Sequence, residues 1–323
     1  MTAAGTTSAL IEVHSYDWSG AGEHSQPQTG IVRCAGPPRA MPVLEAGWSR
    51  TRVLVELCKA AERASQEGRF LVGMDFAFSF PLAEKGNQFP DGSMSRANFW
   101  ARVRDTVWKD GVSGYVARHA AHFLSYDPRT KETKKGIAYK DARRATERAA
   151  TQARAKPNTV FSLIGGNQVG KGSLCGIALL EELRRHCLKS RLPLAVWPFF
   201  VLREDGRETP MTEAAPLEDV PEKCLLLLEI YPSLHWAQAG HAKRRPWDGR
   251  EVWPEVRNHF GAKPAEIDAS SGDEGDALIA WYALSGSRAA NGNPLGTAYL
   301  EKRPGALAIP WAIIREEGWI YGL

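Results

Sequence analysis

The sequence predicts an α/β fold built on a mixed sheet with flanking helices. Three apolar segments each lead into an acidic residue and then turn residues: IEVHSYDWSG from Ile11, FLVGMDFAFSFP from Phe70 and LLLLEIYPSLHW from Leu225. A run of four leucines is typical of a strand that is buried on both faces, and segments with helical spacing separate these strands. A chain of 323 residues, 43% of them hydrophobic, can bury a large core, so we expect one domain over residues 1–323.

The first quarter of the chain predicts an antiparallel meander followed by a helix and a buried strand. Residues 9–17 alternate in polarity and place Asp17 at the end of a strand. Two short apolar runs joined through Gly-Pro-Pro then predict two more strands, and helical spacing followed by Gly68 predicts a helix. The expected elements after the first strand are Thr29–Cys34, Met41–Leu44, the helix Arg52–Glu67 and the strand Phe70–Asp75.

Periodicity weakens between about residues 81 and 159, which predicts an inserted, largely helical segment with loops at 86–95 and 125–136. Helices are expected over Asn98–Phe123 and Tyr139–Ala155. From Arg129 to Lys156 there are ten Lys or Arg residues against three acids. Such an excess is typical of a solvated surface helix or of an arm that contacts phosphate. On the second interpretation, the residues that bind substrate phosphate are Arg143, Arg144 and Arg148.

The second half of the chain again alternates predicted strands and helices, and an acidic linker over about 203–223 precedes the leucine-rich strand. The expected elements are the strand Val160–Leu163, a helix over Ser173–Cys187, the strand Leu194–Leu202, the strand that ends at Glu229, and a helix that begins near Asp273. Apolar residues at helical or alternating spacing predict each of them.

A glycine-rich stretch, Gly165–Ser173, nearly matches a phosphate-binding loop between a strand and a helix. The pattern G-x-x-x-x-G-K is present, but Gly172 stands where that motif has Ser or Thr to hold Mg²⁺. Nucleotide hydrolysis is therefore not favoured. Lys171 at a helix N-terminus remains a candidate for contacting substrate phosphate. The alternative is a tight turn from strand to helix with a purely structural role.

Five acidic residues are candidates for one metal site, because three of them follow apolar strands and two open a helix. Hard divalent cations prefer carboxylate oxygens, and two such ions can clamp the attacking and leaving oxygens of a phosphodiester. We expect Mg²⁺ or Mn²⁺ as cofactor. The predicted metal ligands are Asp17, Asp75, Asp273 and Asp276, and the predicted catalytic residues are Asp17, Asp75, Glu229 and Asp276. An alternative for Asp273 is a role at the helix start, where Ser271 and Glu274 form a capping box.

Composition limits the cell compartments and the classes of partner to be expected. The formal net charge of +4 permits an anionic partner without requiring one. The five cysteines contain no C-x-x-C pair, which favours neither a disulfide framework nor a zinc ribbon. Apolar runs are far shorter than the roughly 20 residues of a membrane-spanning helix. We therefore expect a cytoplasmic protein without a membrane partner; the oligomeric state is left open.

Seven motifs in matching order resemble a domain-of-unknown-function family of bacterial predicted nucleases with an RNase H-like fold. They are the first-strand Asp17, GMDFAFSFP, the R-R-x-T-[DE] element at Arg143–Glu147, VGKGSLCGIALLEELR, EIYP, D-x-x-DAL at Asp273–Leu278, and EGWIYG. The resemblance spans nearly the whole chain. It implies an RNase H-like mixed sheet with flanking helices, in which Asp17 and Asp75 on central strands and Asp276 on the last helix form the metal centre. Glu229 and the basic arm depart from simpler RNase H-like enzymes.

The leading hypothesis is a Mg²⁺- or Mn²⁺-dependent nuclease that hydrolyses phosphodiester bonds of DNA or RNA. Its metal ions would act as Lewis acids and activate water, while the basic arm would hold the backbone. One alternative is a nucleotide-binding phosphotransferase or ATPase of the actin-like superfamily, which shares this sheet order. Another is a non-catalytic binding protein on the same fold. The observation that separates them is whether Asp17, Asp75 and Asp276 converge at an open cleft or are capped by arginines.

Overall fold

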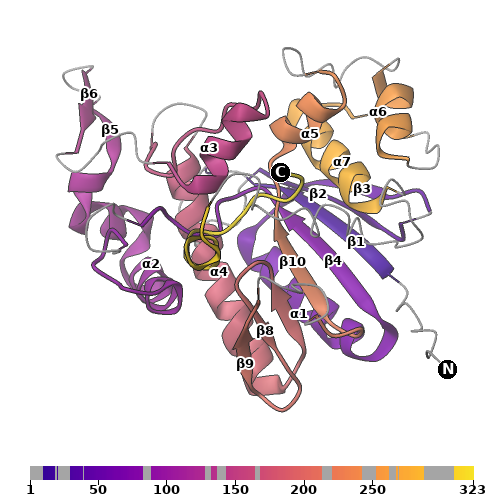
Figure 1. Cartoon of the computed structure of the whole chain (residues 1–323), viewed down its shortest axis with the longest axis horizontal. Coiled ribbons are helices and arrows are strands. Elements are labelled where there is room, and N and C mark those ends of the chain that lie inside the picture. Colours follow the sequence, from indigo (N-terminus) through magenta and orange to yellow (C-terminus); the bar gives the residue numbers. More distant parts are fainter. Residues whose placement is uncertain are drawn as a thin grey trace.

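The computed structural model is a mixed α/β fold in which helices flank an eight-stranded sheet (Figure 1). The structure describes residues 10–18, 20, 30–38, 40–82, 89–127, 132–136, 143–163, 168–212, 220–241, 252–261, 267, 269–286 and 309–323. Within them, the strands of this sheet lie in the order β3-β2-β1-β4-β10-β7-β8-β9. Their bounds are β1 Leu10–Asp17, β2 Ile31–Gly36, β3 Val43–Trp48, β4 Arg69–Met74, β7 Leu194–Val196, β8 Phe200–Leu202, β9 Glu208–Pro210 and β10 Leu225–Glu229.

The centre of the sheet joins the predicted meander to parallel strands. β1 pairs antiparallel with β2, which pairs antiparallel with β3, whereas β1, β4, β10 and β7 run parallel to one another. Met74, the last residue of β4, lies opposite both Tyr16 of β1 and Glu229 of β10. The ends of the three central strands are therefore level, and this register brings the strand-end acids Asp17, Asp75 and Glu229 to one edge of the sheet.

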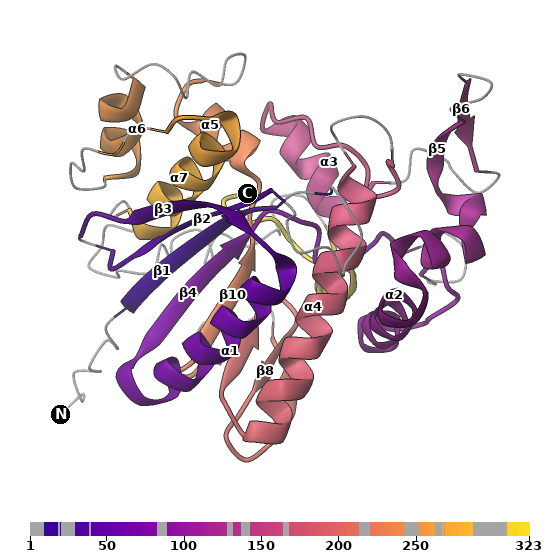
Figure 2. The same cartoon turned by 180° about the vertical axis from the view of Figure 1, so that it is seen from behind.

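Helices cover both faces of the sheet, as the leucine-rich strand predicted. α1 (Arg50–Glu67) and α4 (Val169–Ser190) pack on one face, seen in front in Figure 2. α5 (Pro232–Gln238), α6 (Val252–Phe260) and α7 (Gly272–Ser285) cover the other. Leu225 and Leu227 of β10 belong to the first core, and Leu226 and Leu228 belong to the second. Each buried leucine contributes roughly 1.5–3 kcal/mol, so β10 anchors both layers.

Side-chain caps place the starts of several helices. Ser49 accepts a hydrogen bond from the Arg52 amide at the start of α1, and Ser271 accepts one from the Glu274 amide at the start of α7. Each serine satisfies a backbone donor that has no partner within its helix. The expected cap by Ser271 is confirmed, and it fixes where the first turn of α7 presents its acids. The reciprocal half of the expected capping box was wrong, because Glu274 Oε2 accepts from the Ser270 amide at 2.6 Å instead.

The predicted insertion contains two main helices beside the sheet. It comprises α2 (Arg96–Arg118), the short helix η1 (Ala120–His122), β5 (Leu124–Asp127), β6 (Glu132–Lys135) and α3 (Ala145–Gln152). Gly111, at φ 73°, interrupts α2. In Figures 1 and 2, β5 and β6 lie at the outer end of the insertion, away from the sheet. The loop expected over residues 125–136 was wrong, because β5 and β6 lie there. Strands of four residues are too short to show the alternation of apolar and polar residues that predicts a strand.

Three other expectations need correction. The single strand expected over Leu194–Leu202 is two antiparallel strands, β7 and β8, joined through a turn that contains a cis Trp197–Pro198 bond. The expected acidic linker contains β9, which forms a hairpin with β8 through a turn over residues 203–207. Val160–Leu163 contributes only an isolated bridge from Ser162 to Leu124. Across the described part of the chain, every helix is too short or too polar to span a membrane.

Candidate active site

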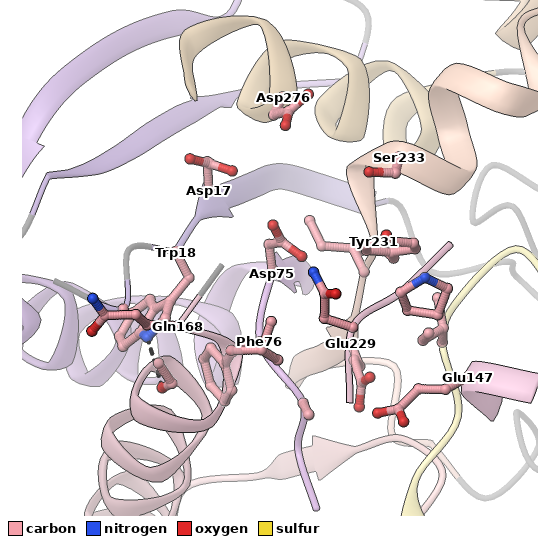
Figure 3. A pocket seen from close by; sticks show the side chains of 18 of the residues that line it. Asp17, Trp18, Asp75, Phe76, Glu147, Gln168, Glu229, Tyr231, Ser233 and Asp276 are labelled. Carbon is pink, nitrogen blue, oxygen red and sulfur yellow. Dashed lines mark hydrogen bonds between the residues drawn. The ribbon is translucent and has the colours of Figure 1, made fainter. Parts of the chain in front are cut away.

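A cavity of about 540 Å³ lies at the carboxyl ends of β1, β4 and β10 (Figure 3). Its described lining residues come from these strand ends, from the starts of α4, α5 and α7, from α3 and the segment after it, and from the segment near residue 320. The acidic lining residues are Asp17, Asp75, Glu147, Glu229, Asp273 and Asp276, and the basic ones are Arg144 and Lys156. All five acids that the sequence singled out therefore line one cavity.

Asp17, Asp75 and Asp276 turn their carboxylates toward a common space (Figure 3). Asp17 ends β1, and Asp75 follows β4 directly, with its amide donating to the Tyr16 carbonyl at 3.0 Å. Asp276 reaches the space from α7, and its Oδ1 accepts a hydrogen bond from the Trp236 indole at 2.6 Å. The structure thus brings together the three residues that the resemblance implied. Asp273 is more exposed, one turn earlier on α7.

The turn that carries Asp75 is fixed by hydrogen bonds from three directions. The Ala77 amide donates to Ser173 Oγ of α4 at 3.2 Å, and the Phe78 amide donates to Glu229 Oε2 at 2.9 Å. The Trp100 indole donates to the Phe78 carbonyl at 2.8 Å. A buried amide without a partner costs roughly 1–3 kcal/mol, so these bonds hold the backbone after Asp75 in one arrangement.

Glu229 points away from the three aspartates, toward Glu147 (Figure 3), and forms a buried ion pair with Arg144. Arg144 Nη2 lies 2.5 Å from Glu229 Oε1, and Nη1 lies 2.8 Å from Oε2. Arg144 Nε also donates to Glu147 Oε1 at 2.9 Å. Burial lowers the pKa of Arg144, but the charges of Glu229 and Glu147 outweigh it and raise this pKa above its ordinary value. Glu229 is therefore placed to support the Asp75 turn and the Arg144 side chain.

The four predicted phosphate-binding residues lie in different places. Arg144 is 2% exposed and paired internally with acids, which does not fit contact with a substrate backbone. Arg148 is exposed and donates to the Arg143 carbonyl at 2.5 Å, and Arg143 donates to Thr151 Oγ1. Lys171 lies in the first turn of α4. Arg143, Arg148 and Lys171 are not among the described residues that line the cavity.

The glycine-rich stretch lies beside the cavity, and residues 164–167 lie outside the described part. Packing accounts for Gly170 within the stretch and for Gly176 just after it. A side chain at Gly170 would come within 2.6 Å of the Val160 carbonyl, and one at Gly176 within 2.3 Å of the Phe76 ring. α4 begins at Val169, four residues before the expected start. These close approaches favour the structural interpretation of the stretch over a nucleotide-binding loop.

Several polar and aromatic lining residues were not among the predicted site residues. Lys156 and Asn158 come from the segment after α3, and Tyr231 and Ser233 come from the start of α5. Trp18 follows Asp17 and donates from its indole to the Gly172 carbonyl at 3.0 Å (Figure 3). Each of these residues lies beside one of the sequence motifs described above. The position of Lys156 at the end of a basic stretch, however, does not predict that it lines this cavity.

The donor set suits a hard divalent cation, since carboxylate oxygens are the ligands that Mg²⁺ and Mn²⁺ prefer. Within the described residues, however, no group of three or more His, Cys, Asp or Glu side chains is arranged to hold a metal ion. Mg²⁺ commonly takes only one or two carboxylates and completes its shell with water and substrate phosphate. Asp17, Asp75 and Asp276 therefore fit such an ion by chemistry and by their shared cavity.

Comparison of the chain with protein-family models, with curated proteins and with solved structures finds no match. The functional interpretation therefore depends on the sequence motifs and on the geometry of the cavity.

Proposed function

We propose that the protein is a Mg²⁺- or Mn²⁺-dependent nuclease whose active site is the cavity at the ends of β1, β4 and β10. The observation that carries the proposal is the convergence of Asp17, Asp75 and Asp276 on this cavity from three elements that lie far apart in the sequence. Among the described lining residues of the cavity are six carboxylates and two cations, in a chain whose formal net charge is +4. Such a site concentrates cations and repels a bare phosphate.

A divalent cation resolves this conflict between an acidic cavity and an anionic substrate. Asp17, Asp75 and Asp276 would hold it, and Asp273 at the more exposed edge could add a ligand. When bound, the cation supplies a Lewis acid for the phosphodiester and a means of activating water. The chain itself holds the carboxylates in place. The Tyr16 carbonyl, Ser173 and Glu229 accept hydrogen bonds from the turn that carries Asp75. Preorganised ligands avoid a rearrangement cost during the reaction.

The topology supports an RNase H-like interpretation of the fold. An antiparallel meander continues into parallel strands, Asp17 and Asp75 lie at the ends of adjacent central strands, and Asp276 lies on a helix that covers them. The resemblance implies the same strand-end positions for Asp17 and Asp75, but it placed Asp276 on the last helix, whereas α9 (Trp311–Glu317) follows α7. The actin-like alternative depends on glycine turns that hold phosphate, whereas Gly170 and Gly176 of α4 allow close packing.

The test is cleavage by purified protein with Mn²⁺ of single- and double-stranded DNA, RNA, hybrid and branched substrates. We expect at least one to be cut, and we expect Asp75→Asn to stop cleavage while sparing binding. Asparagine keeps the size of aspartate but loses the charge that holds the cation, while phosphate contacts elsewhere supply most of the affinity.

The matched control is Asp105→Asn, which alters a carboxylate on α2 that is 60% exposed and lies outside the described cavity lining. It should cleave as the parent does, and identical purification of both variants excludes a contaminating nuclease. Failure of every substrate, or equal cleavage by Asp75→Asn, would contradict the proposal. A nucleotide-hydrolysis assay on the same preparations would then test the phosphotransferase alternative.

A further inference from the structure

We infer that Lys156 is the residue that binds the substrate phosphate in the cavity that it shares with the acids that would hold the cation. This inference rests on the proposed function and assigns a side chain for the anionic part of the substrate. Lys156 was part of the basic stretch in the sequence, but only the structure relates it to Asp17 and Asp75, which line the same cavity.

The charge distribution of the cavity singles out Lys156. Arg144, the other cation among the described lining residues, has its guanidinium bound by Glu229, Glu147 and the Glu317 carbonyl. Lys156 is exposed, and within the described part of the chain it takes part in no ion pair. An ammonium group on a flexible stem is a common phosphate ligand, and it needs no fixed orientation to act as one.

The segment that carries Lys156 is built into the fold. Its neighbours Ala155 and Pro157 are buried, and the Ala155 amide donates to the Ala150 carbonyl at 3.0 Å. α3 before it is anchored at its start, where the Ala145 amide donates to Glu317 Oε2 at 2.8 Å. The backbone at Lys156 is thus fixed relative to β10 through Arg144 and Glu229.

Asn158 strengthens the assignment because it lines the same cavity two residues further along the chain. Lys156 and Asn158 therefore offer a cation and an amide to one cavity, which suits a phosphate with a neighbouring sugar or base. The substrate class is a phosphate ester that reaches the acids with its phosphate flanked by Lys156.

The experiment compares Lys156→Met with Lys156→Arg and with Lys189→Met, a change at an exposed lysine near the end of α4. Binding is measured by fluorescence anisotropy in the Asp75→Asn background, with a labelled oligonucleotide of the type that the parent cleaves. We expect Lys156→Met to weaken binding about tenfold, the effect of losing one charged hydrogen bond. It should also reduce the slope of the logarithm of the binding constant against the logarithm of the salt concentration by about 0.7–0.9. Lys156→Arg should restore most of the binding.

The outcomes separate this inference from the proposed function. If the parent cleaves and Mn²⁺ stabilises it, but Lys156→Met binds with parental affinity and slope, the assignment of Lys156 fails alone. Equal losses in Lys156→Met and Lys189→Met would also overturn it, because they would indicate a general charge effect. If the parent neither binds Mn²⁺ nor cleaves any substrate, the proposed function fails, and this inference, which rests on it, fails as well.

Discussion

Arg144 and Arg148 lie four residues apart in one basic stretch, yet they have opposite environments. Arg144 is buried between Glu229 and Glu147, and Arg148 is exposed. We expect Arg144→Met to lower the free energy of unfolding by about 3–5 kcal/mol, because Glu229 would stay buried without its partner. Arg148→Met should leave stability within about 0.5 kcal/mol of the parent. Urea denaturation measures both changes.

The same pair of variants tests phosphate contact by the basic arm. If Arg148 binds the substrate backbone, Arg148→Met flattens the salt dependence of nucleic-acid binding by about one unit of slope. Arg144→Met at a temperature where it remains folded should leave that slope unchanged. A smaller slope for Arg144→Met would contradict the purely internal role that its ion pairs indicate.

His235 on α5 gives a pH-dependent prediction. Burial lowers its pKa to about 4, while the side-chain hydrogen bond with Gln238 opposes the shift. The folded state therefore favours the neutral ring, so its stability should fall as pH drops from about 6.5 to about 4 and level off below that. The free energy of unfolding lost through this group is roughly 3 kcal/mol. His235→Gln should reduce the loss in denaturation curves, and an NMR titration that finds an ordinary histidine pKa would contradict the assignment.

At the scale of elements, Glu317, the last residue of α9 (Trp311–Glu317), binds two separate parts of the insertion. Its carboxylate accepts from the Leu82 amide at 2.9 Å, where the insertion begins, and from the Ala145 amide, where α3 begins. We expect Glu317→Ala to cost about 2–4 kcal/mol, since one buried and one partly buried amide lose their acceptor. It should also speed proteolysis within residues 82–159. The control is Glu62→Ala, a change at an exposed position of α1, and it should change neither measurement.

The elements that could be predicted from the sequence are those with a strong local signal. Four consecutive leucines predicted a strand buried on both faces, and helical spacing predicted α1, α4 and α7. Short elements such as β5, β6 and β9 were missed because three or four residues hold no periodicity. The acids at strand ends were predictable for the same reason as their strands. The Arg144–Glu229 pair joins residues 85 positions apart, and nothing local specifies it.

For the whole molecule, a cation bound only by the folded state should raise its melting temperature. Mn²⁺ at about one hundred times its dissociation constant would add about 2.7 kcal/mol of stability. We expect a rise in thermal unfolding with Mn²⁺ that Asp17→Asn abolishes and that Asp105→Asn retains. A melting curve that does not respond to millimolar Mn²⁺ would argue against the cation site that underlies the proposed nuclease.

The position of β10 in the sheet has a consequence for how the chain folds. β10 pairs with β4 on one side and β7 on the other, and both neighbours precede it in the sequence. Until Leu225–Glu229 is in place, β4 and β7 each present an open, apolar strand edge, the kind of surface that recruits other chains. Contacts between partners that lie so far apart in sequence also form slowly. Refolding yield should therefore fall steeply with protein concentration, with loss to aggregates that precede closure of the sheet.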